Sequence, residues 1–241
     1  MLKIKNQADN SAEMYIYGDI IDDEDGAWLK SYDMQTGYQF PADIRTQLDS
    51  LRGKDLTIYI NSNGGSVPAG VAIANMLARH DGHTKAIVDG WCCSIATQIF
   101  FACEEREIPS NAYLMVHKPA TCVCGNADDM LRAADSLDTI QAGLESTYLK
   151  AAKDGVTADD IREMVNNETW LTGDQAAEYF ILNVSDAQKT AAYYGGKGMT
   201  DKIPAGIKPV EDIKVPNDDE NEIARAKIKL VLAKAKGAFI E

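Results

Sequence analysis

The chain has 241 residues, of which 45% are hydrophobic, and this is enough for one sizeable core with a small appendage. Its net charge of −13 repels phosphate backbones, which argues against nucleic-acid binding through a broad basic surface. It shows neither the roughly 20 consecutive apolar residues that span a bilayer nor a secretory signal near residue 1, so we expect a cytoplasmic protein that does not enter a membrane.

Strands and helices are expected to alternate along the first 185 residues. Each expected strand is a short apolar run, and most expected helices have a capping residue or apolar residues at three-and-four spacing. The strands are expected over residues 14–17, 56–60, 84–88 and 112–116. The helices are expected over residues 41–51, 66–80, 94–101 and 126–154, with two short ones beginning at capping boxes on Thr157 and Thr172. This alternation predicts an α/β fold with layered helices and sheet.

The helix expected over residues 126–154 is the longest. Asn126 is expected to cap it, Asp128 and Asp129 suit its first turn, and Gly155 is expected to end it. Its apolar stripe fits core packing and contact with another subunit equally well, and the sequence leaves both open.

The composition changes near residue 186. Residues 1–185 carry a net charge of −14, whereas residues 186–241 carry +1. A glycine-rich stretch and three prolines indicate a linker, and Asn217 then suits the cap of a helix with an acidic start and a basic end. We therefore predict a folded domain over 1–185 and a linker with a C-terminal helix over 186–241.

The first segment with candidate chemistry is Asn61-Ser62-Asn63-Gly64-Gly65-Ser66, which joins a strand to a helix. Paired glycines let the backbone approach a ligand closely, and they aim N–H groups at whatever lies beside the helix start. An oxyanion hole needs such donors, although most Gly-Gly pairs are only turns.

The second segment runs from Asp89 to Ala96 and joins the next strand to the next helix. A serine at this junction, Ser94, can point its hydroxyl into a cleft while the following amide faces an oxyanion, or it can simply cap the helix. Cys93 is the nucleophile only if the register is shifted by one residue, which would rotate the side chain by about 100° at a helix start.

The third segment ends in His117, which closes an apolar strand and precedes Lys-Pro. We expect it at a sheet edge, facing a cleft as a general base. His80 and His83 suit a solvated helix end, and as an H-x-x-H pair they lack a third metal ligand. The five cysteines include an adjacent pair and no C-x-x-C, which favours reduced thiols over disulfides or zinc.

These segments, followed by a fourth, resemble the successive blocks of the ClpP-like serine peptidases. The blocks are residues 61–65, Gly90 with Ser94, residues 115–119 (Met-Val-His-Lys-Pro), and residues 168–179, which begin Glu-Thr-Trp-Leu-Thr-Gly-Asp. The resemblance runs from about residue 14 to 186 and keeps the order of the blocks. Within the group, the sequence is most similar to the phage-borne members, some of which process capsid proteins during head assembly.

The resemblance implies a ClpP/crotonase-like fold of repeated ββα units with a long protruding helix. It implies a serine endopeptidase without metal or organic cofactor, in which Ser94 is the nucleophile and His117 the base. Gly65 and Ile95 match the two oxyanion donors. The third triad position, usually Asp, falls on Glu168, which could instead be an exposed acid at a helix end, with Asp174 as the fallback.

The resemblance further implies a homo-oligomeric ring that encloses polypeptide substrates. We expect a head maturation protease that processes capsid or scaffold proteins, in the host cytoplasm or the procapsid, with a tail that is self-cleaved, scaffold-binding or merely solvated. Three alternatives stay open: the proteolytic subunit of a protease served by an ATPase unfoldase, a crotonase-fold acyl-CoA enzyme, and a head component with an inactive triad.

Overall fold

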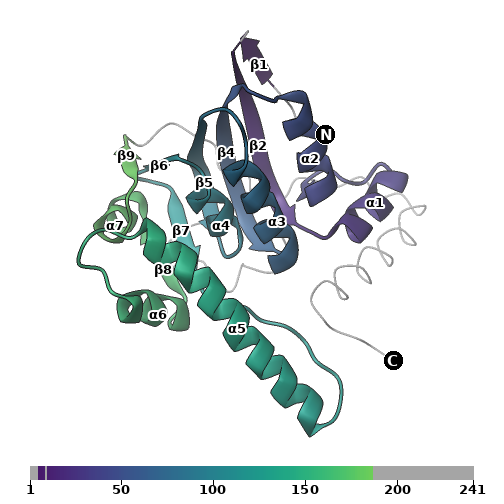
Figure 1. Ribbon diagram of the computed structural model, residues 1–241, viewed down its shortest axis with the longest axis vertical. Helices are drawn as coiled ribbons and strands as arrows, with labels where there is room; N and C mark the ends of the chain where they lie inside the picture. The colour runs from purple at the N-terminus through teal and green to yellow at the C-terminus, as the bar shows by residue number, and fades with distance from the viewer. Residues whose placement is uncertain (1–4, 9, 187–241) are drawn as a thin grey trace, which may run out of the picture. The chain divides into compact units, whose positions relative to one another are not determined.

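The computed structural model describes residues 5–8 and 10–186 (Figure 1). Its strands are β1 (Lys5–Ala8), β2 (Ser11–Ile20), β3 (Tyr38–Gln39), β4 (Asp55–Gly65), β5 (Thr84–Cys93), β6 (Glu105–Pro109), β7 (Tyr113–Val116), β8 (Thr169–Thr172) and β9 (Asn183–Ser185). Its helices are α1 (Asp23–Ser31), α2 (Pro41–Ser50), α3 (Val67–Ala78), α4 (Ala96–Phe101), α5 (Ala127–Ala151), α6 (Ala158–Asn166) and α7 (Gly173–Tyr179). The predicted appendage beyond residue 186 lies outside these residues, so the division of the chain stays a prediction.

A mostly parallel sheet forms the centre of the described part of the chain. Its strand order is β1-β2-β4-β5-β6-β9, and β3 pairs with β2. The pairs among β2, β4, β5, β6 and β9 are parallel, whereas β1 pairs antiparallel with β2. The α/β class expected from the sequence is confirmed.

The sheet divides at β5, and this division positions the candidate site. The first half of β5 pairs with β6 through Lys85–Ile87, and its last residues pair with β7 through Trp91–Cys93. β7 in turn pairs antiparallel with β8. The carboxyl ends of β5 and β7 therefore lie side by side.

The hydrophobic core lies between the sheet and helices α2, α3 and α4, which cover one of its faces (Figure 1). Side chains alternate along the strands, as the period of two residues requires, so Met14, Ile16, Ile58 and Ile60 are buried on the helix side. The neighbouring residues face the other side, where the rings of Tyr15 and Tyr59 stack.

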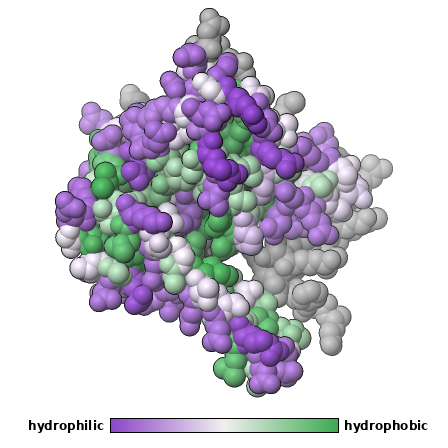
Figure 2. Space-filling model, in the orientation of Figure 1, coloured by the Kyte–Doolittle hydropathy of each residue, from purple (hydrophilic) through white to green (hydrophobic). Residues whose placement is uncertain are grey.

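The long helix α5 projects from this body (Figure 1). Asn126 caps it through a capping box, as predicted, whereas the helix ends at Ala151 and not at Gly155. Its C-terminal half packs on the core through Leu144, Tyr148 and Ala151. Its N-terminal half is exposed, and Figure 2 shows hydrophobic residues beside hydrophilic ones at this end of the molecule.

Of the helices that the structure describes, none combines the length and the apolar character that a membrane span requires.

Candidate active site

Ser94 lies in the turn between β5 and α4. Its backbone amide donates a hydrogen bond to the Met115 carbonyl at 2.9 Å, and its φ is +55°, a left-handed value that is strained for a residue with a side chain. The helix begins at Ala96 with Ile95 in the N-cap position, so the expectation that Ser94 opens or caps this helix is wrong. The turn leaves the Ser94 hydroxyl available for another partner.

That partner is His117, which is 23 positions away in the sequence. Met115 pairs with Cys93 where β7 meets the end of β5, so the residues that follow the two strands lie close together. The Nε2 atom of His117 is 2.7 Å from the Oγ atom of Ser94. β7 has partners on both sides, β5 and β8, so His117 follows the carboxyl end of an interior strand and not a sheet edge as expected.

Gly64 lies directly against the Ser94 turn. A Cβ atom on Gly64 would be 2.7 Å from both the Cys93 carbonyl oxygen and the Ser94 Cβ atom, and its φ is +93°. Only glycine fits this position without displacing the backbone that carries the nucleophile. The sequence singled out the Gly-Gly pair, but not this contact.

The two expected oxyanion donors are the backbone amides of Ile95 and Gly65. Ile95 follows Ser94, and its nitrogen would be 3.1 Å from a Cβ atom on Gly64. The Ser66 amide donates to the Ile20 carbonyl in the neighbouring strand β2. Gly65 lies between Gly64 and Ser66 at the end of β4, and its φ of +143° is a backbone conformation that favours glycine.

Glu168 follows helix α6 and immediately precedes β8. It is half-buried and has a φ of +48°. The ladder between β7 and β8 pairs Val116 with Thr169, so its continuation sets Glu168 opposite His117. Asp174 is exposed in the first turn of α7, beyond the other end of β8, which pairs with Tyr113. Continued by one residue, the register of this ladder places Glu168 level with His117, whereas Asp174 lies beyond the other end of β8.

The Cys93 side chain is buried at the end of β5. Burial raises the pKa of its thiol from the ordinary value of 9.0 to about 12, so the group is protonated near neutral pH. A nucleophilic cysteine requires a thiolate. The alternative in which Cys93 replaces Ser94 as the nucleophile therefore has no support in the structure.

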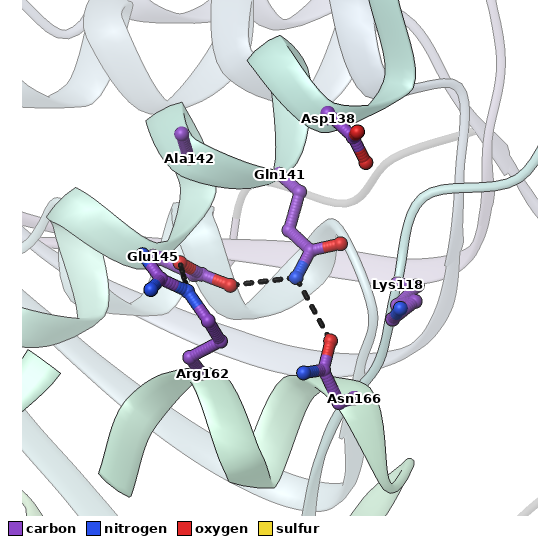
Figure 3. Close-up of a pocket in the computed structure, with 7 residues that line it drawn as sticks. All are labelled: Lys118, Asp138, Gln141, Ala142, Glu145, Arg162 and Asn166. Carbon is purple, nitrogen blue, oxygen red and sulfur yellow. Dashed lines mark hydrogen bonds and ion pairs between the residues drawn. The ribbon is translucent and has the colours of Figure 1, made fainter. Parts of the chain in front are cut away.

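A cavity of about 320 Å³ lies near these residues, between α5 and α6 (Figure 3). Lys118, next to His117, and Asn166, two residues before Glu168, line it. Gln141 donates to Glu145 at 2.7 Å and to Asn166 at 3.1 Å, and Arg162 lies 3.4 Å from the buried Glu145 carboxylate. Polar side chains on the wall of the cavity thus connect α5 to α6 through hydrogen bonds and an ion pair.

The other histidines have structural partners. The Nε2 atom of His80 is 2.7 Å from the Lys54 carbonyl oxygen, and exposed His83 forms ion pairs with Glu104 and Glu105. Within residues 5–8 and 10–186, no three His, Cys, Asp or Glu side chains are grouped as a metal site would need.

Several known proteins are similar to this chain in sequence. A family model described as Clp protease matches residues 38–187, more than half of the chain. The ATP-dependent Clp protease proteolytic subunit 3 of Rhodococcus jostii (strain RHA1) is 29% identical over 132 residues, which are 54% of this chain and 64% of that protein. An ATP-dependent Clp protease proteolytic subunit of Bacteroides fragilis is 29% identical over 139 residues, 56% of this chain and 66% of its own length.

A solved structure supports the fold. A ClpP1 mutant from Listeria monocytogenes superposes with a TM-score of 0.59 at 23% identity, over 74% of this chain and 93% of that one. At this identity the likeness concerns the fold alone. The chain spans just under two thirds of the length of the two curated relatives described above.

Proposed function

Since the chain belongs to the Clp protease family, we propose that it is a serine endopeptidase in which Ser94 is the nucleophile and His117 the general base. The single observation that carries this proposal is the 2.7 Å contact between the His117 Nε2 and Ser94 Oγ atoms. A serine hydroxyl needs a base at hydrogen-bond distance to become an effective nucleophile.

In the proposed reaction, His117 removes the Ser94 proton as Oγ attacks the carbonyl carbon of a peptide bond. The oxyanion that forms accepts hydrogen bonds from the Gly65 and Ile95 amides. His117 then protonates the leaving amine, and a water molecule repeats the sequence to release the acyl group from Ser94. Every step uses side chains and backbone that the chain itself provides.

Glu168 is proposed as the third member of the triad. Because Nε2 of His117 faces Ser94, the Nδ1 atom faces away from it, and a carboxylate there would fix the tautomer in which Nε2 accepts the serine proton. The β7–β8 register supports Glu168 for this position. Glu168 itself has a positive φ. Its side chain is one methylene longer than that of the aspartate usual at this position in the resembling family.

We further propose a homo-oligomer, in which the exposed half of α5 contacts another copy. Met130 is 54% exposed and Leu131 65% exposed on this half, and neighbouring exposed apolar side chains can mark a contact surface. A ring of subunits would also confine a peptidase that acts in the cytoplasm. Light scattering at micromolar concentration tests this, and a monomer of about 26 kDa alone would contradict it.

The biological role has two candidates. The names of the relatives described above favour a proteolytic subunit that works with an ATPase, and co-purification with an ATPase would support it. The motif resemblance to phage-borne members favours a head maturation protease that processes capsid or scaffold proteins. In that role we propose that the tail is self-cleaved, so intact masses of the wild type and Ser94→Ala that differ only by the oxygen atom of the substitution would argue against self-cleavage. The family match favours either role over an acyl-CoA enzyme.

Hydrolysis of unfolded casein and fluorogenic peptides by the full chain tests the proposed activity. The wild type should release product, and Ser94→Ala should lose the activity by several orders of magnitude. Cys93→Ala is the matched control next to it in the chain and should keep the activity. Equal rates for the wild type and Ser94→Ala would reject the proposed nucleophile.

A further inference from the structure

Two buried hydroxyl groups from different helices meet behind the Ser94 turn. Thr97 lies in the first turn of α4 and is fully buried, and Tyr148 lies in the C-terminal half of α5 and is 2% exposed. The Thr97 Oγ1 and Tyr148 hydroxyl oxygens are 2.7 Å apart. Neither residue belongs to the motifs that are visible in the sequence.

The direction of this hydrogen bond follows from the other contact of Thr97. Its Oγ1 atom donates to the backbone carbonyl of Ser94 at 2.6 Å. A hydroxyl group has one proton, so the Thr97 hydroxyl accepts from its second partner. Tyr148 therefore donates to Thr97, and Thr97 donates to the Ser94 carbonyl. These two consecutive hydrogen bonds connect α5 to the turn that carries Ser94.

The hydrogen bonds from Tyr148 to Thr97 and from Thr97 to the Ser94 carbonyl, called the hydroxyl relay below, end on a strained residue. Ser94 has a φ of +55°, its amide is held by the Met115 carbonyl, and its carbonyl also accepts from the Thr97 amide at 3.0 Å. Strained backbone persists only where the surroundings determine it. On the basis of the proposed peptidase function, we propose that Thr97 and Tyr148 are positioning residues that hold the Ser94 turn so that its hydroxyl stays within reach of His117.

A hydrogen bond from a threonine hydroxyl to the backbone carbonyl three residues earlier is common in helices. By itself it would indicate only a structural role. The additional hydroxyl of Tyr148 distinguishes this site, because it orients the Thr97 hydroxyl from another helix. The Gln98 side chain, which also hydrogen-bonds Tyr148, donates to the Leu144 carbonyl at 3.3 Å and so provides a further link between α4 and α5. Removing the two hydrogen bonds of the hydroxyl relay should therefore disturb the Ser94 turn without separating α4 from α5.

The test uses the full chain with three single variants: Thr97→Val, Thr97→Ser and Tyr148→Phe. The readouts are the rate at which a fluorophosphonate probe modifies Ser94, kcat and KM for a fluorogenic peptide, and the thermal midpoint Tm. Thr97→Val should lower the probe rate and kcat by about 10-fold with little change in KM, which is the size expected for one lost hydrogen bond. Thr97→Ser keeps the hydroxyl and should react within about 2-fold of the wild type.

The double variant, Thr97→Val with Tyr148→Phe, separates positioning from stability. Thr97→Val alone leaves a buried tyrosine hydroxyl without its acceptor and should lower Tm, whereas removal of both hydroxyls should largely restore Tm. Positioning predicts that the probe rate of the double variant stays as low as that of Thr97→Val. A rate that recovers together with Tm would show a structural role only and would overturn the proposal.

Two further results separate this proposal from the proposed function. If the wild type itself is not modified at Ser94, the peptidase proposal fails, and the relay fails with it. If the wild type is modified but Thr97→Val and Tyr148→Phe react at the same rate as the wild type, only the relay is rejected. Equal losses in Thr97→Val and Thr97→Ser would likewise reject it, since the serine retains the donor.

Discussion

Val116 of β7 pairs with Thr169 of β8, and this register sets the residues just beyond them, His117 and Glu168, opposite each other. The pairing connects two sequence blocks that are about fifty residues apart. It also leaves Asp174 at the far end of β8, exposed on α7. The assignment of the triad acid therefore depends on one antiparallel ladder.

Glu168→Gln is expected to lower kcat by about 10³- to 10⁴-fold, because the amide no longer stabilises the imidazolium or the correct tautomer. Asp174→Asn is the matched control. It removes only a charge near a helix start, which costs about 0.5 kcal/mol, and it should leave kcat within about 2-fold of the wild type. A large loss in Asp174→Asn with an active Glu168→Gln would reverse the assignment.

Gly64→Ala is expected to reduce the rate of Ser94 modification by about 100-fold, since the new Cβ atom would displace the nucleophile turn. Gly53→Ala is the control, because Gly53 also has positive φ (+72°) but nothing within 4 Å of the added Cβ atom. It should cost about 1 kcal/mol of stability without loss of activity. Similar labelling rates in the two variants would show that the Gly64 contact is unimportant.

Arg162→Ala is expected to lower the free energy of unfolding by about 1 kcal/mol, because it leaves the buried Glu145 carboxylate with Gln141 as its remaining partner. The expected loss of stability is small because Arg162 is half exposed and water screens its charge. Asp159 is 94% exposed and lies 3.9 Å from the same arginine, so Asp159→Asn is the control and should change stability by less than about 0.5 kcal/mol. Urea unfolding measures both, and equal effects would contradict the role of burial.

Stability is expected to fall at alkaline pH because of the buried thiols. Burial raises the pKa of Cys93 to about 12, above the ordinary 9.0 that applies to the unfolded chain. This difference stabilises the folded state fully below about pH 9 and is lost as the pH rises through the folded pKa. The urea midpoint should therefore drop as the pH rises from about 9 towards 12, and less so in Cys93→Ala. A drop of equal size in both proteins would contradict this origin.

Local chemistry made several elements predictable from the sequence. Ser66, Asn126, Thr157 and Thr172 accept the backbone N–H bonds of the helices that they were expected to cap. Each cap depends on residues within one turn, and these are visible in the sequence. Helix α1 was not predicted, because its acidic residues and Gly26 form no apolar stripe, and β8 is too short to show alternation.

The site was predictable as a set of residues, but not as an arrangement. Ser94 and His117 were expected together from their motifs, whereas their contact arises because β7 lies beside the end of β5, a long-range pairing that neither segment encodes. The predicted start of helix α4 at Ser94 was wrong, because nothing in the sequence reveals that Ser94 adopts a positive φ. Thr97 and Tyr148 were missed for a similar reason, since they are 51 positions apart.

The most direct test of the central claim is modification of the native full chain by a fluorophosphonate probe, followed by intact mass and peptide mapping. One probe per chain on Ser94, absent in Ser94→Ala and retained in Cys93→Ala, is the predicted result. A probe attached to another residue, or equal labelling of Ser94→Ala, would contradict the account.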